Sequence, residues 1–564
     1  MAVTSEHSTE VPEPYYYLWH LAALKVIDAD FGPAPSTPPN LEIPAVREAC
    51  RPTVKSTVWD QIAAAGTGTM VTASVALIDV GICPDHPNLK TRLDQDRSID
   101  LASHPFGART IAQYDELDPY SPEQQEAFFG GLDLTGLGDL GLSNDDTAYF
   151  KSLTAELAAS RGCVRRLMNP EALFGAHGTA CAGLIAGEPA ANTSGTSEVS
   201  SPETLFTETG SEAEPNKNRN VLPYFGVDPF SRLISIRTSF DTDPAQFICA
   251  FLYAYHQHAD VIVLPRGLPD PEHLRLEPKA ELTTDAGLYQ NRLTGDLVRR
   301  LSLVGEAEEL DPNSPQPAES GRRLWRILRH VILGVSRKIP IVCAAGNSGE
   351  SQLIYPANLA EEDNGIIAVG SVTAEGFRSG YSNYGNRLTL VAPSDDQEVI
   401  NRHQLRVDHQ FPFHARHAHI AGRSKEYRYS GLGLLTTDLP GSWGYESGDD
   451  PWSSVPFEEN RGIGGGYYTN FGGTSGASAL IGGICSLIQR AHKTKHGQST
   501  SLDGVTVKAL LVAASDPHRV VAPGFRPLTP DCMNSDHEDG KGSAYFFGAG
   551  LPDAAAAVQA ALAT

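Results

Sequence analysis

Residues 75–81 read Val-Ala-Leu-Ile-Asp-Val-Gly, a short apolar run that ends in an acidic residue and a turn. An uninterrupted apolar run of this length is typical of a parallel strand buried on both faces. Further strands of this kind are expected at 232–238, 259–265, 339–347, 365–372 and 388–393, and helices at 177–187, 244–258, 322–338, 473–492, 505–515 and 552–563. This alternation predicts an α/β fold with a doubly wound, mainly parallel sheet and helices on both faces.

The composition excludes several classes of protein. The 564 residues include 44 Lys and Arg against 68 Asp and Glu, so the formal net charge is −24. Such a chain is poorly suited to binding nucleic acid or an anionic membrane surface. No apolar run reaches the roughly 18 residues that span a bilayer, and the first residues do not resemble a secretory signal. The eight cysteines are scattered without a CxxC pair. We therefore expect reduced cysteines and a cytoplasmic protein.

Three short stretches carry residues suited to nucleophilic catalysis. Asp79 ends the first strand, His177 opens the helix-like stretch HGTACAGLIAG, and Ser475 lies in GGTSGAS before an apolar helix. Each alone has an ordinary interpretation: a turn residue, a polar helix start and a helix N-cap. Taken together, Asp, His and Ser in this chain order form one of the known sequential orders of the Ser-His-Asp triad.

These stretches resemble the three catalytic motifs of the subtilisin-like serine proteases, the subtilases. Asp79-Val80-Gly81 matches the D-x-G motif, residues 177–183 match HGTxxAG, and residues 473–479 match GTSxAxP with Ala479 in place of the usual proline. The resemblance runs from about residue 55 to the C-terminus. Its shorter motifs lie at 225–229, 344–347, 355–357, 368–372, 381–385 and 547–554.

The resemblance implies a serine endopeptidase that acts on a peptide or protein substrate. Ser475 would be the nucleophile, His177 the general base, Asp79 the residue that orients the imidazole, and Asn347 of the AAGN stretch a donor in the oxyanion hole. No cofactor or metal is expected, since the family's calcium loop has no convincing counterpart. Two alternatives remain: an acyltransferase or macrocyclase that uses the same triad but excludes water, and a non-catalytic scaffold that binds a partner.

The substrate cleft departs from the family pattern. Leu264, Pro265, Arg266 and Gly267 stand where subtilases have a Ser-x-Gly strand that pairs with substrate, and Pro265 lacks a backbone donor. The Arg266 side chain could meet an acidic group of the substrate or point to solvent, and the second is favoured. Ile354 stands where the family often has a glycine at the base of the S1 pocket, which implies a preference for a small residue before the scissile bond.

The predicted organisation is an N-terminal arm over 1–54 and one peptidase domain over 55–564. The arm is partly Pro-rich, is expected to be irregular and contains no recognisable foldase propeptide. The fold is therefore expected to form without such a foldase, or a separate inhibitory or activating protein is expected as partner. Insertions that rim the cleft are expected near 95–170, 190–220, 268–320, 395–430 and 441–466.

Cys181 follows His177 by four residues on the expected helix. Residues spaced by four share a helix face, so the sulfur is expected one turn beneath the imidazole. The thiol either only fills core volume, or its modification disturbs the triad.

Overall fold

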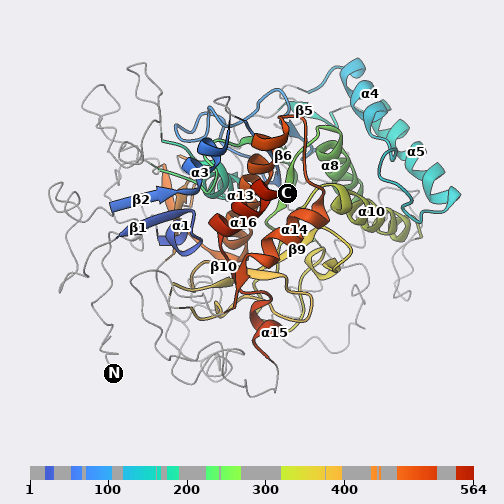
Figure 1. Cartoon of the computed structure of the whole chain (residues 1–564). Coiled ribbons are helices and arrows are strands. Elements are labelled where there is room, and N and C mark those ends of the chain that lie inside the picture. Colours follow the sequence, from blue (N-terminus) through green and yellow to red (C-terminus); the bar gives the residue numbers. More distant parts are fainter. Residues whose placement is uncertain are drawn as a thin grey trace, which may run out of the picture.

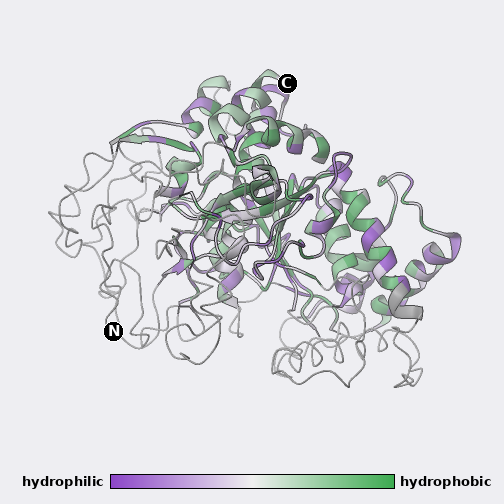
Figure 2. Cartoon of the chain, turned by 90° about the horizontal axis from the view of Figure 1, so that it is seen from below, coloured by the Kyte–Doolittle hydropathy of each residue, from purple (hydrophilic) through white to green (hydrophobic). Residues whose placement is uncertain are grey.

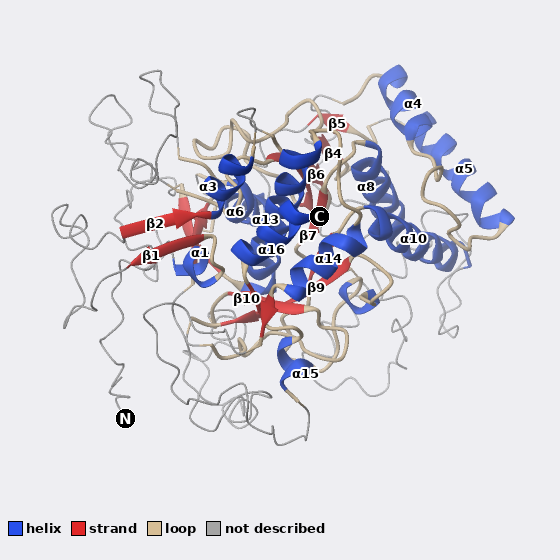
Figure 3. Ribbon diagram, viewed as in Figure 1, coloured by secondary structure: helices blue, strands red, loops and turns tan. Residues whose placement is uncertain are grey.

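A computed structural model of the chain describes residues 19–30, 53–66, 71–103, 119–160, 162–166, 175–189, 224–239, 243–268, 319–374, 376–396, 433–440, 444–445, 467–517 and 542–564. At its centre lies an eight-stranded sheet in the order β10-β9-β8-β7-β3-β6-β4-β5 (Figure 3). The strands are β3 (Ser74–Asp79), β4 (Ile99–Asp100), β5 (Arg165–Arg166), β6 (Arg232–Arg237), β7 (Val261–Leu264), β8 (Ile341–Ala344), β9 (Ile366–Val372) and β10 (Leu390–Pro393). Every pairing is parallel except that of β4 with β5. The predicted mainly parallel sheet is confirmed.

The sequence of β3 explains its central place. Val75 to Ile78 are fully buried because neighbouring strands and helices cover both faces. β3 pairs with β6 on one side and with β7 on the other, and Asp79 lies opposite Arg237 at the carboxyl end. Functional groups of parallel α/β sheets gather at this end.

Helices cover both faces of the sheet, as predicted (Figure 1). The crossover helices α8 (Pro244–His256) and α10 (Glu319–Lys338) pack against each other, and α6 (Gly175–Ala186) packs against α13 (Gly473–His496). The apolar residues of the central strands and helices form one continuous core (Figure 2). Other helices in the described residues are α3 (Val58–Ala65), α14 (Gly504–Ala513), α15 (Ser543–Phe547), α16 (Ala554–Ala563) and the short η5 (Ala357–Leu359).

The central helix α13 is held by buried ion pairs near its C-terminal half. Lys493 Nζ lies 2.7 Å from Asp260 Oδ2, and Arg490 Nε lies 3.1 Å from Asp228 Oδ1. Ser486 donates to the second oxygen of Asp228. A buried charge must be paired to be tolerated, so these contacts fix how the helix lies on the sheet.

The expectation of an irregular arm is wrong for residues 19–30. Helix α1 (Trp19–Ala23) is buried, and β1 (Ile27–Asp30) pairs antiparallel with β2 (Thr53–Thr57). Trp19 Nε1 donates to the carbonyl of Gly433, 414 positions along the chain. This short apolar segment therefore packs against the rest of the described chain. The Pro-rich stretch over 31–44 lies outside the described residues.

The expected insertion near 95–170 belongs in part to the central sheet, since β4 and β5 complete its edge. Between them, α4 (Pro122–Gly131) and α5 (Asn144–Ala159) pair and project beside α8 and α10 (Figures 1 and 3). Asp146 of α5 accepts hydrogen bonds from Arg326 of α10, which anchors the pair. The expected insertion at 190–220 lies wholly outside the described residues. The other expected insertions lie largely outside them.

Two further sheets in the described residues have two strands each. β11 (Leu434–Thr437) pairs antiparallel with β12 (Tyr468–Phe471), and β13 (Ser515–Asp516) pairs with β14 (Leu551–Pro552). No helix within the described ranges combines the length and apolar character that crossing a membrane requires.

His86, in the loop after β3, makes the fold sensitive to acid. Its buried Nδ1 accepts from the N–H of Asn88, so Nε2 carries the proton and donates to the carbonyl of Tyr467 at 2.8 Å. Burial lowers the pKa of His86 to about 4. The unfolded chain, with a histidine pKa near 6.5, therefore binds more protons between pH 4 and 6.5, and stability falls as the pH drops through this window.

We expect His86→Asn, which keeps a side-chain acceptor, to show a flatter pH dependence of stability. The difference in free energy of unfolding between wild type and variant should shrink by about 2 to 3 kcal/mol from pH 7 to pH 4.5. Urea unfolding at the two pH values measures it. An unchanged difference would contradict the assignment.

Candidate active site

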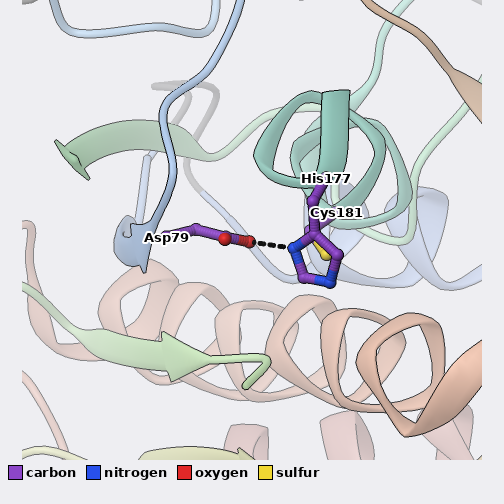
Figure 4. A group of neighbouring side chains, drawn as sticks. All are labelled: Asp79, His177 and Cys181. Atoms are coloured by element: carbon purple, nitrogen blue, oxygen red, sulfur yellow. Dashed lines mark hydrogen bonds and ion pairs between the residues drawn. The ribbon is translucent and has the colours of Figure 1, made fainter. Parts of the chain in front are cut away.

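Asp79 and His177 are joined at the carboxyl end of β3 (Figure 4). Asp79 is 1% exposed, and its Oδ2 lies 2.8 Å from Nδ1 of His177. Its other oxygen accepts from the N–H of Val80. A carboxylate at Nδ1 favours the tautomer with the proton on that nitrogen, which leaves the lone pair on Nε2. The imidazole is thus oriented as a general base requires.

Two glycines allow this contact. Gly81 follows the strand with a φ of +108°, and a Cβ on Gly178 would lie 2.1 Å from the carbonyl oxygen of Gly81. Only glycine permits that backbone approach. Thr179 adds a hydrogen bond from the N–H of Cys83 to its hydroxyl. The small residues of the two motifs therefore seat the start of α6 on the turn after β3.

Ser475 is the third residue of α13. Its Oγ donates to the carbonyl of Pro265 at 2.7 Å. The N–H of Gly473 donates to the hydroxyl of Tyr381, and the N–H of Thr474 donates to Oδ1 of Asn347. Among the residues that the structure describes, none accepts from the N–H of Ser475. Such a group at a helix start is suited to a developing negative charge.

Asn347 is tied to the same helix start through Thr474. Its Oδ1 accepts from both the N–H and the hydroxyl of Thr474, at 2.9 and 2.7 Å. The Thr474 hydroxyl in turn accepts from the N–H of Gly346. Because the amide oxygen faces Thr474, the amide nitrogen is directed away from it. Asn347 Nδ2 and the N–H of Ser475 are therefore two candidate oxyanion donors, and Thr474 connects them.

The residues predicted to line the cleft lie in different surroundings. Leu264 is a fully buried strand residue paired with Cys343, so its side chain belongs to the core, and the substrate contact expected of this segment stays a prediction. The carbonyl of Pro265 reaches Ser475. The expectation that Arg266 points to solvent is wrong. It is 7% exposed, and its guanidinium lies 5.6 Å from the centre of the Phe247 ring of α8.

Ile354 fills the space between two backbone segments of the cleft. A Cβ on Gly267 would lie 2.6 Å from Ile354 Cδ1, and one on Gly346 would lie 2.7 Å from Ile354 Cγ2. The N–H of Ile354 donates to the carbonyl of Ala345. Its side chain therefore lies where the segment after β7 faces the segment after β8.

Two neighbours of the site were not predicted to be site residues, although one of them, Tyr381, lies in the motif at 381–385. The Phe471 ring of β12 lies edge-on to the His177 ring, with 5.5 Å between centroids. Tyr381 reaches Gly473 from a loop 92 positions earlier. Thr474 could have been found, because it lies inside the serine motif.

Cys181 lies beneath the imidazole, as the spacing on α6 predicts (Figure 4). One ligand atom each from Asp79, His177 and Cys181 lies within 4.8 Å of the others. Burial, with the negative charge of Asp79, raises the pKa of the thiol well above its usual value. This set of donors suits a soft metal ion, which would compete with the hydrogen bond between Asp79 and His177.

We expect mercuric ion to block labelling of Ser475 by a fluorophosphonate in the wild type. The Cys181→Ala variant should keep its labelling and resist mercury. Cys485→Ala is the matched control, because Cys485 is a buried cysteine on α13 and should leave mercury sensitivity intact. A Cys181→Ala variant as sensitive as wild type would contradict the role of this thiol.

Comparisons with known proteins agree with these motifs. A family model described as the subtilase family matches residues 72–550. Subtilisin BL of Lederbergia lenta is 41% identical over 58 residues, which are 10% of this chain and 20% of that protein. The chain thus matches about a fifth of the length of this curated relative.

Two solved structures are similar at lower identity. The epidermin leader peptide processing serine protease of Staphylococcus aureus is 16% identical, with 87% of this chain and 76% of that chain covered and a TM-score of 0.42. A lanthipeptide protease is 13% identical, with 86% and 88% covered and a TM-score of 0.42. Because the family model spans most of its length, the chain belongs to the subtilase family.

Proposed function

We propose that the chain is a serine endopeptidase that cleaves peptide bonds through an acyl-enzyme on Ser475. One observation carries the proposal: the 2.8 Å hydrogen bond from His177 Nδ1 to the buried carboxylate of Asp79, at the carboxyl end of the central strand. A serine hydroxyl is a weak nucleophile without a base, and this pair supplies one in the right tautomer. Membership of the subtilase family supports the same assignment.

The reaction begins when the Ser475 hydroxyl leaves the carbonyl of Pro265 and turns to Nε2 of His177. The base takes the proton as Oγ attacks the substrate carbonyl carbon. Asn347 Nδ2 and the N–H of Ser475 then donate to the oxygen that becomes negative. His177 passes the proton to the leaving amine, and water repeats the sequence on the acyl-enzyme. The vacated carbonyl of Pro265 is then able to accept an N–H of the substrate.

The residue before the scissile bond is proposed to be small. Ile354 stands where the family often has a glycine at the base of the S1 pocket, and its side chain occupies the space between Gly267 and Gly346. A long side chain would have to displace a branched residue packed against two backbones. Overpacking of this kind costs about 1 to 3 kcal/mol.

We propose one peptidase domain over 55–564, supported by the family match over 72–550 and by the place of β4 and β5 in the central sheet. The six described cysteines are free and buried, which supports a reducing compartment such as the cytoplasm. We also propose a peptide or protein as the substrate and a separate inhibitory or activating protein as a partner.

Replacing the nucleophile tests the function directly. We expect Ser475→Ala to abolish fluorophosphonate labelling and to lower kcat by about 10⁴ to 10⁶ with the fold unchanged. Hydrolysis within tenfold of wild type would exclude the triad. Mass analysis of the products distinguishes linear peptides from cyclic or transpeptidated ones, and a folded wild type that is never labelled would favour a scaffold.

Replacing Ile354 tests the proposed preference for a small residue before the scissile bond. In a library of peptides that differ only before the scissile bond, wild type should prefer Ala or Gly. Ile354→Gly should raise kcat/KM for Phe or Leu at that position by about 10- to 100-fold, with little change for Ala. Ile354→Val serves as the matched control and should shift the preference only slightly. An unaltered preference in Ile354→Gly would place the pocket elsewhere.

A further inference from the structure

The loop before β10 holds both sides of the candidate oxyanion hole. Tyr381 contacts the start of α13, while Asn383 contacts the segment around Asn347. The N–H of Asn383 donates to the carbonyl of Gly346, and its Oδ1 accepts from the N–H of Ser348. The two residues that flank Asn347 are thus tied to the same three-residue turn that reaches the catalytic helix.

At the helix start, three hydrogen bonds close a ring around Gly473. Its N–H donates to the Tyr381 hydroxyl at 2.9 Å, and its carbonyl accepts from the Ser394 hydroxyl at 3.0 Å. The Tyr381 and Ser394 oxygens lie 2.8 Å apart. Because the single proton of Ser394 goes to Gly473, Tyr381 is the donor between the two hydroxyls. The Tyr381 hydroxyl also donates to Oδ1 of Asp395 at 3.2 Å, so its single proton is shared between Ser394 and Asp395.

The backbone inside this ring has no local helix cap, so another part of the chain must supply its hydrogen bonds. Gly473 has a φ of +73°, and the N-cap residue Gly472 makes no side-chain capping bond. A Cβ on Gly472 would lie 2.1 Å from Asp395 Oδ1, so the carboxylate packs directly on this backbone. Tyr381, Ser394 and Asp395 are all nearly fully buried. A cap supplied from 92 positions away therefore replaces the local cap that the helix lacks.

We propose that Tyr381 is a positioning residue for the nucleophile and the oxyanion hole, acting through Gly473. The ring fixes both polar groups of the Gly473 peptide, and Ser475 follows two residues later. Donors aimed at a developing charge lose effect with small displacements, so the hydroxyl contributes to the rate without touching the substrate. This inference rests on the proposed function.

The test compares Tyr381→Phe, Ser394→Ala and the double variant. Each single variant should slow fluorophosphonate labelling of Ser475 and lower kcat by about 10- to 100-fold, with KM within about twofold. Binding of a peptide boronate, which forms a tetrahedral adduct, should weaken by the same factor as kcat/KM. Because both variants open one ring, the double variant should be no worse than the more impaired single variant.

Tyr384→Phe is the matched control, since Tyr384 lies in the same loop but packs against Tyr545 and Phe546 of α15. It should keep wild-type labelling and kinetics. A purely structural Tyr381 would lower the melting temperature and leave boronate affinity and kcat unchanged well below that temperature, which would overturn the inference. Additive effects of Tyr381→Phe and Ser394→Ala would overturn it as well. If wild type itself were not labelled, the proposed function would fail instead.

Discussion

The hydrogen bond between His177 and the buried Asp79 carboxylate depends on a backbone contact that only glycine permits. α6 begins so close to the turn after β3 that a Cβ on Gly178 would lie 2.1 Å from the Gly81 carbonyl oxygen. The carboxylate itself is fixed by the central strand of the sheet, paired on both sides. The small residues of the two motifs are therefore needed for geometry before any chemistry takes place.

The nucleophile is positioned by a different device. Ser475 lies at the start of a 24-residue helix whose far half is anchored by the buried pairs Lys493–Asp260 and Arg490–Asp228. Its near end is held by Thr474 against Asn347 and by Tyr381 around Gly473. A helix fixed at both ends cannot slide along the sheet, so Ser475 keeps its position relative to the carboxyl ends of the strands. Buried ion pairs are weak sources of stability but specific about arrangement, which suits this role.

Much of the fold could be predicted from the sequence because its signals are local. Each buried strand is an apolar run, and the residues near the chemistry lie in short motifs with small neighbours. Arg266 could not be placed, because its orientation depends on Phe247, which lies on α8. The packing of 19–30 was missed for a similar reason, since Trp19 finds its partner at Gly433. Tyr381 lies in the motif at 381–385, but its contact with Gly473, like that of Phe471 with His177, arises only through the tertiary fold.

The structure of a covalent adduct with a peptide boronic acid would show whether Ser475, His177 and Asn347 act together on a tetrahedral centre. We expect a tetrahedral boron bound to Ser475 Oγ, which has left the Pro265 carbonyl. One boronate oxygen should lie within hydrogen-bond distance of both Asn347 Nδ2 and the N–H of Ser475, with His177 still bonded to Asp79. An adduct on another residue, or an oxygen that meets neither donor, would contradict it.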